Sequence, residues 1–218
     1  MEKEDYIKRF NEEDAVGWIE IDKKIDSVYP GVEPRHYGPL CGIHYMAGGT
    51  DPIDGISVYD HKSNPEHLHL ISYGMSEIYY NPEAAGQEFS KWGFEFTFRL
   101  VPYSGDQGDP GWMMQVFNNL ARYVIKSGRW FEENQYIPAN GPIRLDTDTA
   151  IVGFATTLDP ELGRIATPHG EVSFIQLVGI TQKELDYLNE FKSVEKVAAF
   201  LEDMKKDNPF LVTDLNRK

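Results

Sequence analysis

The sequence predicts an α+β (mixed α/β) fold, in which helices flank a central, mostly antiparallel or mixed β-sheet. Three observations support this class. Strand-like segments form a block through the middle of the chain, helix-like segments occupy both ends, and one helix-like segment interrupts the strands without strict alternation of strand and helix. Because the chain shows no internal repeat and no long linker, residues 1–218 are expected to form a single domain.

The N-terminal segment, residues 1–28, carries recurring apolar side chains in a strongly charged background. They are Tyr6, Ile7, Phe10, Val16, Ile19 and Ile25. This pattern predicts one or two amphipathic helices that pack on the body of the domain. The following stretch is rich in Gly and Pro, and there we expect a loop, a short strand over Cys41–Met46 and a second loop.

Patterns typical of strands fill the middle of the chain. Short strands are predicted at Ile56–Tyr59, His67–Tyr73 and Ser76–Tyr80. The polar segment 60–65 separates the first two as a turn, and Gly74 breaks the chain between the second and the third.

The clearest strand pattern is Gly93–Val101. Its apolar side chains alternate with polar ones, because Phe94, Phe96, Phe98 and Leu100 share one face while Glu95, Thr97 and Arg99 share the other. One face of this strand is therefore core, and the other is wet or covered by a polar contact.

A helix follows this strand. Asp109 is the expected N-cap, Pro110 the first helical residue and Gly128 the stop signal. Residues 130–148 contain Pro and Gly and are expected to be irregular, and a strand is predicted at Ile151–Thr156.

The C-terminal part begins with a strand at Glu171–Ile180. It is apolar on both faces, which predicts a central place in the sheet. Thr181 and Glu184 form a capping-box pattern that opens a helix, and Ser193 caps the next one. Phe210–Asp214 is a candidate last strand.

Charge and cysteine content restrict the class of partner and the compartment. The chain has 21 Lys and Arg against 35 Asp and Glu, a formal net charge of −14, so its surface repels nucleic acid and favours a cationic partner. A single cysteine, Cys41, fits a reducing compartment, and no apolar run is long enough for a signal peptide or a membrane span. We expect a soluble, cytoplasmic protein, with its oligomeric state left open.

Catalytic motifs are missing from the chain. We find no glycine-rich phosphate-binding loop, no Gly-x-Ser-x-Gly and no His-Glu-x-x-His. Cys41 with His44 is read as core packing rather than as a nucleophile and base. The sequence therefore predicts a non-catalytic protein that binds another protein and uses no cofactor.

One alternative is a metal-binding protein or a metal-dependent enzyme. His67 and His69 stand two apart on a predicted strand, so both imidazoles point to one face. Glu77, Asp60 or His61 would supply a third ligand. The competing interpretation is that both histidines bond to neighbouring carboxylates or backbone.

Several motifs in one order resemble the Suppressor of fused family. They are TDPIDGISVYD at 50–60, PEHLHLISYGMSEIY at 65–79, WGFEFTFRL at 92–100, LARYV at 120–124, TPHGEVSFIQLVGIT at 167–181 and LVTDLNR at 211–217. The resemblance covers roughly residues 30–217. It implies a single domain similar to the N-terminal domain of the animal protein.

The resemblance also implies a function. The animal protein is a non-enzymatic inhibitor in Hedgehog signalling that clamps an extended Gli-type peptide between two domains, with the peptide added as a strand. Here the second domain is not expected, and single-domain bacterial relatives are thought to be immunity proteins. An acidic immunity protein would suit a basic toxin. A peptide-binding scaffold or regulator is a further alternative.

The family's peptide-facing region corresponds to HLHLISYGMSE and the residues after it. The resemblance therefore points to six candidate partner contacts, namely His69, Leu70, Tyr73, Glu77, Tyr79 and Tyr80. Leu70 stands where the family has Tyr, and Glu77 stands where it has Asp. These departures keep a strand and an acid but change the detail of the surface.

Overall fold

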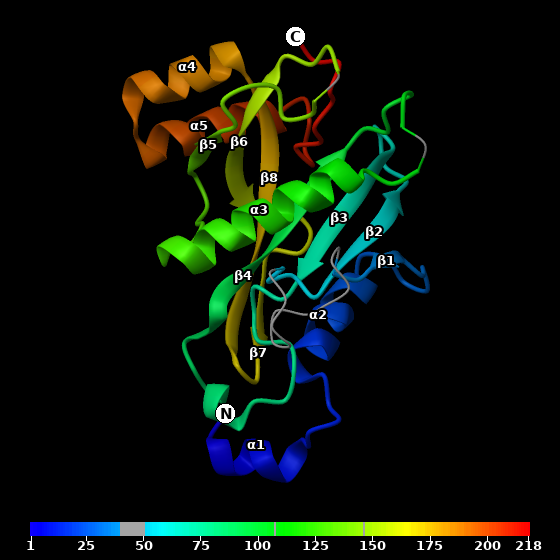
Figure 1. Cartoon of the computed structure of the whole chain (residues 1–218), viewed down its shortest axis with the longest axis vertical. Helices are drawn as coiled ribbons and strands as arrows, with labels where there is room; N and C mark the ends of the chain where they lie inside the picture. The colour runs from blue at the N-terminus through cyan, green and yellow to red at the C-terminus, as the bar shows by residue number, and fades with distance from the viewer. Residues whose placement is uncertain (40–50, 107, 146) are drawn as a thin grey trace.

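The computed structural model describes residues 1–39, 51–106, 108–145 and 147–218, and within them one β-sheet carries helices on both faces (Figure 1). The helical elements of these ranges are α1 (Lys3–Arg9), α2 (Val16–Asp26), the 3₁₀ turn η2 (Pro82–Ala84), α3 (Gly111–Ser127), α4 (Gln182–Phe191) and α5 (Val194–Lys205). The strands are β1 (Arg35–Tyr37), β2 (Gly55–His61), β3 (His67–Tyr73), β4 (Phe89–Leu100), β5 (Tyr136–Pro138), β6 (Ile151–Leu158), β7 (Arg164–Thr167) and β8 (Gly170–Thr181). The predicted Cys41–Met46 strand and the Cys41 and His44 pair lie outside the described residues.

The described strands form an eight-stranded sheet in the order β1-β2-β3-β4-β8-β6-β5, with β7 also paired to β8. Neighbouring strands run antiparallel except β4 and β8, which are parallel. β8 lies between β4 and β6, as its apolar residues on both faces predicted. The predicted mixed α/β class with a mixed central sheet is confirmed. The single-domain assignment stays a prediction.

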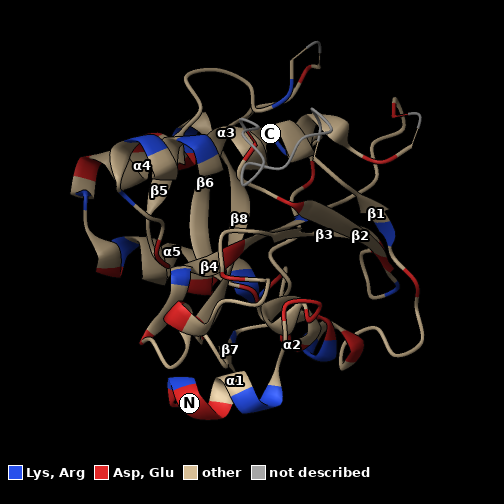
Figure 2. Cartoon of the chain, turned by 60° about the horizontal axis from the view of Figure 1, so that its bottom comes forward, with Lys and Arg blue, Asp and Glu red and all other residues tan. Residues whose placement is uncertain are grey.

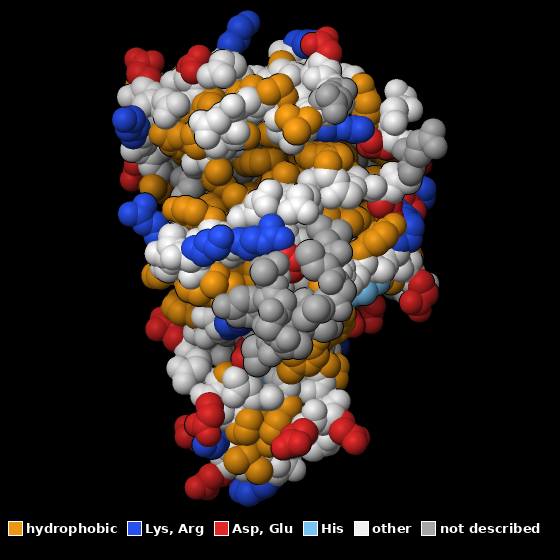
Figure 3. Space-filling view, viewed as in Figure 1, with side chains coloured by type: hydrophobic (Ala, Val, Ile, Leu, Met, Phe, Trp, Pro, Cys, Tyr) orange, Lys and Arg blue, Asp and Glu red, His pale blue; other side chains and the backbone are white. Residues whose placement is uncertain are grey.

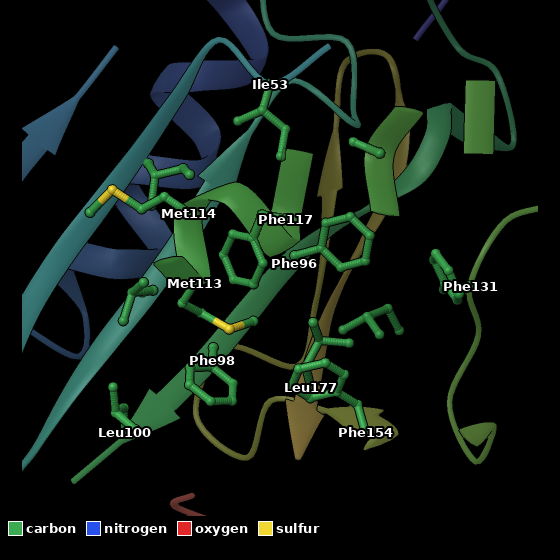
Figure 4. Close-up of a cluster of buried hydrophobic side chains, with 14 of the residues drawn as sticks. Ile53, Phe96, Phe98, Leu100, Met113, Met114, Phe117, Phe131, Phe154 and Leu177 are labelled. Carbon is green, nitrogen blue, oxygen red and sulfur yellow. The ribbon is translucent and has the colours of Figure 1, made fainter. Parts of the chain in front are cut away.

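The largest hydrophobic cluster lies between α3 and one face of the sheet (Figure 4). The apolar side chains of β4 point into it, and Phe96 stacks on Phe117 of α3 with ring centroids 5.5 Å apart. Phe98 meets Trp112 edge to face at 6.1 Å. Burial of these rings removes a large apolar area from water, which is the main force that holds α3 on the sheet.

Two smaller clusters occupy the opposite face. Ile21 and Ile25 of α2 pack with Tyr73 of β3, while Leu188 of α4 packs with Val178 of β8. β4 contributes no described side chain to either cluster, because its residues on this face are polar. None of the helices in the described ranges is long and apolar enough to cross a membrane.

Three helix-end predictions are confirmed. Gly128 ends α3 with a left-handed φ of 70°, and its N–H bonds to the carbonyl of Val124. Thr181 and Glu184 form both bonds of a capping box at the start of α4. The Ser193 hydroxyl accepts a bond from the N–H of Lys196 at the start of α5.

The predicted start of α3 is wrong by one residue. Asp109 does not cap the helix, because its carboxylate binds the Arg35 guanidinium at 2.7 and 3.0 Å and accepts a bond from the Tyr37 hydroxyl at 2.8 Å. Pro110 is instead the cap residue, without a side-chain bond, and α3 begins at Gly111. A long-range ion pair has replaced a local cap.

The predicted last strand at Phe210–Asp214 is also wrong. Thr213 alone makes a bridge, to Leu100, while the Asn208 side chain binds both the N–H and the carbonyl of Val212. Those backbone groups are therefore not available for hydrogen bonds to a neighbouring strand. Three short strands of the described ranges went unpredicted: β1, inside a stretch expected to be a loop, β5, inside the segment expected to be irregular, and β7.

Candidate functional site

The polar face of β4 is fully buried and organises the centre of the molecule. Glu95, Thr97 and Arg99 are each 0% exposed, so the polar face predicted from the alternation is covered rather than wet. Each side chain bonds to groups from other elements, as buried polar groups require. These bonds determine where the surrounding segments lie.

Arg99 holds the loop that follows β6. Its Nε and Nη2 donate to the two oxygens of Asp159 at 3.2 and 3.0 Å, and Nη2 also donates to Glu161 at 2.8 Å. The Thr97 hydroxyl donates to Asp159 at 3.2 Å. A buried guanidinium needs such a set of acceptors, because an unpaired charge in the interior is very costly.

Both histidines of β3 belong to this network. Nδ1 of His67 donates to the carbonyl of Pro65 at 2.8 Å, and its Nε2 accepts from Arg99 at 3.0 Å. Nδ1 of His69 accepts from the Tyr29 hydroxyl at 2.8 Å, and its Nε2 lies 3.0 Å from Asp159. These partners assign one neutral tautomer to each imidazole.

Burial and the nearby Arg99 charge lower the pKa of His67 and of His69 to about 4. Burial also disfavours a charge on Asp159, but its contacts with His69 and Arg99 outweigh that penalty and hold the pKa of the carboxyl well below its usual range. At neutral pH the charged members at the centre are therefore Arg99 and Asp159, and the imidazoles are neutral.

This arrangement does not favour the metal alternative. Both nitrogens of His67 and of His69 already face protein partners, and the Arg99 guanidinium lies beside them. His61 stacks on His67 with ring centroids 4.5 Å apart, but its Nε2 faces Glu161. In the described part of the chain, no group of three or more His, Cys, Asp or Glu side chains is placed to hold a metal ion.

Glu95 anchors the turn that follows β3. Its carboxylate accepts bonds from the hydroxyl of Ser72, from the N–H groups of Gly74 and Met75, and from the N–H and hydroxyl of Ser76. Burial raises the pKa of this carboxyl, while the bonds from Ser76, Ser72 and Gly74 oppose that effect. The turn is thereby fixed at the point where the chain leaves the sheet.

The predicted strand at Ser76–Tyr80 is wrong for the same reason. The Ser76 N–H is used by Glu95, the Glu77 N–H by the Ser90 hydroxyl at 2.9 Å, and the Ile78 carbonyl by the N–H groups at the start of α2. No strand can pair with a backbone whose groups are already occupied. The segment 77–80 is instead an irregular stretch held from several sides.

The first turn of α2 approaches this segment closely. The N–H groups of Gly17 and Trp18 donate to the carbonyl of Ile78 at 3.0 and 3.2 Å. A β-carbon on Gly17 would lie 2.0 Å from the carbonyl oxygen of Glu77, so only glycine fits there.

A further bridge comes from α1 and the β7–β8 turn. Tyr6 is fully buried, and its hydroxyl lies 2.7 Å from Nε2 of His169 and accepts from the N–H of Asn81 at 3.1 Å. Nδ1 of His169 in turn donates to the carbonyl of Glu77 at 3.0 Å. Four segments distant in sequence therefore hold the backbone of residues 77–81.

The six predicted contact residues divide into two groups. His69, Leu70 and Tyr73 are buried in β3. Tyr73 bonds to Asp22 of α2, His69 bonds to Tyr29 in the loop after α2, and Leu70 lies in the core cluster under α3. Tyr79 is 39% exposed, and Glu77 and Tyr80 are partly accessible. Only the second group can be reached from solvent, and it lies on the firmly held segment 77–80.

A groove of about 830 Å³ lies at the distorted start of β4. The pairing of β4 with β8 shifts between Phe89 and Phe94, where Lys91 and Gly93 have positive φ angles of 56° and 77°. The bulge turns side chains outward. The groove is lined by Phe89, Trp92, Trp130, Phe131 and Val194 together with several charged residues.

Sequence reasoning missed this groove. Phe89 and Trp130 are 52% and 55% exposed, which is high for such large apolar side chains. In the space-filling view of the α3 side, hydrophobic patches lie between charged side chains, and acidic residues surround the lower end near α1 (Figure 3). The only available signal was the Lys-Trp-Gly sequence just before the regular alternation of β4.

The fold is that of a Suppressor of fused-type domain. The family model for Suppressor of fused protein matches residues 49–218, and the chain belongs to this family. The Suppressor of fused homologs of mouse and human are each 31% identical to it over 199 residues. The match covers 87% of this chain and 41% of each relative, so the chain spans about two fifths of the length of these relatives.

Solved structures show the same fold. A crystal structure of the Sufu–Fu complex has a chain that is 28% identical, with a TM-score of 0.82 and coverage of 94% of this chain and 92% of that one. Drosophila Suppressor of Fused is 28% identical with a TM-score of 0.81, covering 95% of this chain and 52% of that one. A homolog from Neisseria gonorrhoeae, at 16% identity and a TM-score of 0.60, shows likeness of fold alone and covers 93% and 95% of the two chains.

Proposed function

We propose that this chain is a non-enzymatic, inhibitory protein-binding domain, and that Glu77, Tyr79 and Tyr80 contact the partner. One observation carries the proposal: accessible Tyr and Glu side chains stand on a segment whose backbone is held by α1, α2, β4 and the β7–β8 turn. A contact surface that is already ordered loses little conformational entropy on binding. Tyr is well suited to such surfaces, because it offers a large ring and a polar tip.

The groove at the start of β4 extends this surface. The Ser90 hydroxyl that binds Glu77 sits between Phe89 and Lys91, so segment 77–80 and the groove are joined by β4 itself. Exposed aromatic side chains in a concave site are the usual anchors for a partner's side chains. His69, Leu70 and Tyr73 then act as positioning residues, because they hold β3 and its turn in place.

Within this proposal, the partner is an extended peptide or a protein with basic character, and the favoured case is a cognate toxin neutralised in the cytoplasm. The formal charge of −14 supports a basic partner, since opposite charges accelerate encounter. The solved Sufu–Fu complex supports protein binding by a related domain. A scaffold or regulator with a peptide ligand would use the same surface without a toxin.

The test is co-expression with basic proteins encoded by neighbouring genes, followed by co-purification and a growth assay. Stable capture together with relief of toxicity supports the immunity role. Capture without toxicity favours the scaffold or regulator. If no neighbouring gene product is captured, the immunity role is wrong.

Single substitutions test whether the partner contacts segment 77–80. Tyr79→Ala and Glu77→Ala should weaken capture while the melting temperature stays close to that of the parent. Tyr187→Ala is a matched control, because Tyr187 is similarly exposed but lies on α4, where it contacts Phe191. If both site variants bind like the control, segment 77–80 is not the contact surface.

A further inference from the structure

A second cavity, separate from the groove, lies between α2 and the β1–β3 end of the sheet. It has a volume of about 650 Å³, which is in the range of small-molecule sites. The loop after α2 forms its outer rim, and the strands form its floor. Figure 2 shows acidic positions along α2 beside these strands.

The wall of this cavity is aromatic. Trp18 of α2 stacks on Tyr73 of β3 with ring centroids 4.4 Å apart and an interplanar angle of 20°. His36 of β1 lies 5.3 Å from the Trp18 ring, and Tyr59 of β2 completes the floor. Trp and Tyr rings present negative faces, which attract organic cations.

Three carboxylates line the same cavity. They belong to Asp22 and Asp26 on α2 and to Glu33 on the loop that follows. None of them forms an ion pair with a Lys or Arg in the part of the chain that the structure describes, and none of the described lining residues is Lys or Arg. The hydrogen-bond partners of Asp22 are neutral, since the Tyr73 hydroxyl donates to it at 2.9 Å and the Trp18 side chain also bonds to it.

The three carboxylates influence the same side chain in the cavity, that of Tyr59. Burial, followed by the charges of Asp22, Asp26 and Glu33, raises the pKa of Tyr59 to about 12. Burial also raises the pKa of the Asp22 carboxyl and lowers that of His36, so at neutral pH the imidazole does not balance the negative charge. The cavity therefore combines uncompensated negative charge with a partly desolvated aromatic wall.

We propose that this cavity binds an organic cation, a guanidinium or alkylammonium group, which stacks on Trp18 and pairs with Asp22 and Asp26. Charge-assisted bonds to the carboxylates and contact with the rings are the two attractions that such a group makes, and a neutral molecule of the same shape makes only the second. The cation is either a basic side chain of a bound protein or a free polyamine. The inference goes beyond the proposed function, because it concerns a different surface.

The experiment titrates the whole chain with N-acetyl-arginine amide, with spermidine and with N-acetyl-citrulline amide, a neutral mimic of the arginine side chain. Binding is followed by the NMR signal of the Trp18 indole N–H, assigned with Trp18→Phe. Both cations, or one of them, should shift this signal, and the citrulline compound should not. Saturation by the arginine amide with weaker spermidine binding indicates a protein side chain as the source, and the reverse order indicates a free polyamine.

Charge-removing variants complete the test. The double variant Asp22→Asn with Asp26→Asn should lower the association constant about tenfold or more, which corresponds to the loss of a charge-assisted bond. Glu20→Gln is the matched control, because Glu20 is on α2 but pairs with Lys23 and does not line the cavity. Circular dichroism melts verify that each variant is folded.

Three results would overturn the proposal: no shift with either cation, an equal shift with the citrulline compound, or unchanged affinity in the folded double variant. Tyr79→Ala should leave cation binding unchanged. The cation-site proposal and the partner-surface proposal can therefore be disproved independently of each other.

Discussion

Nη2 of Arg99 lies 3.0 Å from Oδ1 of Asp159, and both side chains are 0% exposed. This pair joins β4, in the middle of the sheet, to the loop after β6. Thr97 and His69 contact the same carboxylate, and Glu161 contacts the same guanidinium. The polar face of the sheet is therefore organised around one buried ion pair.

Arg99→Met should destabilise the domain by about 3–5 kcal/mol, because it leaves Asp159 as a buried charge without its main partner. The free energy of unfolding in urea is the measurement. Arg164→Met is the control, since Arg164 forms exposed pairs with Glu133 and Glu171 that contribute at most about 1 kcal/mol. Similar losses in the two variants would contradict the role assigned to the buried pair.

Stability should fall as the pH drops from about 6.5 toward about 4. The native pKa of His67 and of His69 is about 4, lowered by burial from the usual 6.5, so across this window the unfolded chain binds more protons than the native state. The contribution of the neutral imidazoles is complete above the unfolded pKa and is lost as the pH approaches the native one. At about 1.4 kcal/mol per pH unit, the loss reaches a few kcal/mol.

Urea unfolding from about pH 7 to about pH 5 measures this dependence, before most carboxylates titrate. His69→Gln should be less stable than the parent at the upper limit and should show a shallower decline. A parent protein whose stability does not change across this range would show that the histidines are not held neutral.

Glu95→Ala should cost at least about 3 kcal/mol and loosen the turn after β3, because it removes the acceptor of five bonds and leaves buried donors unpaired. Hydrogen exchange should accelerate at the amides of Gly74 and Ser76. Glu88→Ala serves for comparison, since Glu88 is exposed and its backbone carbonyl bonds to the N–H of Glu171, which the substitution leaves in place. Unchanged protection at both amides would mean that Glu95 does not hold the turn.

Gly17→Ala should destabilise the domain by about 1–3 kcal/mol, because a β-carbon there meets the Glu77 carbonyl and pushes α2 away from segment 77–80. Gly111→Ala is the matched substitution in α3, where a β-carbon meets nothing within 4 Å. It should be neutral or stabilising by up to about 1 kcal/mol, because Ala favours the helix. Thermal melts compare the two, and equal effects would exclude a specific clash at Gly17.

Local periodicity predicted much of the fold. The bounds of β3 match the His67–Tyr73 prediction, and the alternation in β4 separated its apolar face from its polar one. The capping box at Thr181 and the stop at Gly128 were also correct. These features depend on residues within a few positions of each other, so a single sequence contains their cause.

The site was only partly predictable. The PEHLHLISYGMSE motif led to the correct segment, but it did not separate the buried His69, Leu70 and Tyr73 from the accessible Tyr79. Residue type does not separate the two groups, because residues of these types occur both in strands and on surfaces. Burial depends on which helix covers them, and α2 lies about fifty residues earlier in the chain.

Residue order alone thus determined which side chains alternate, where helices begin and end, and that the surface is strongly acidic. It could not assign Asp159 to Arg99, Asp109 to Arg35 or the Ile78 carbonyl to α2, because a polar group can satisfy its bonds with many partners of equal chemistry. The packing of apolar faces brings one of those partners into place. That packing therefore creates the buried ion pair, the held segment 77–80 and the acidic aromatic cavity.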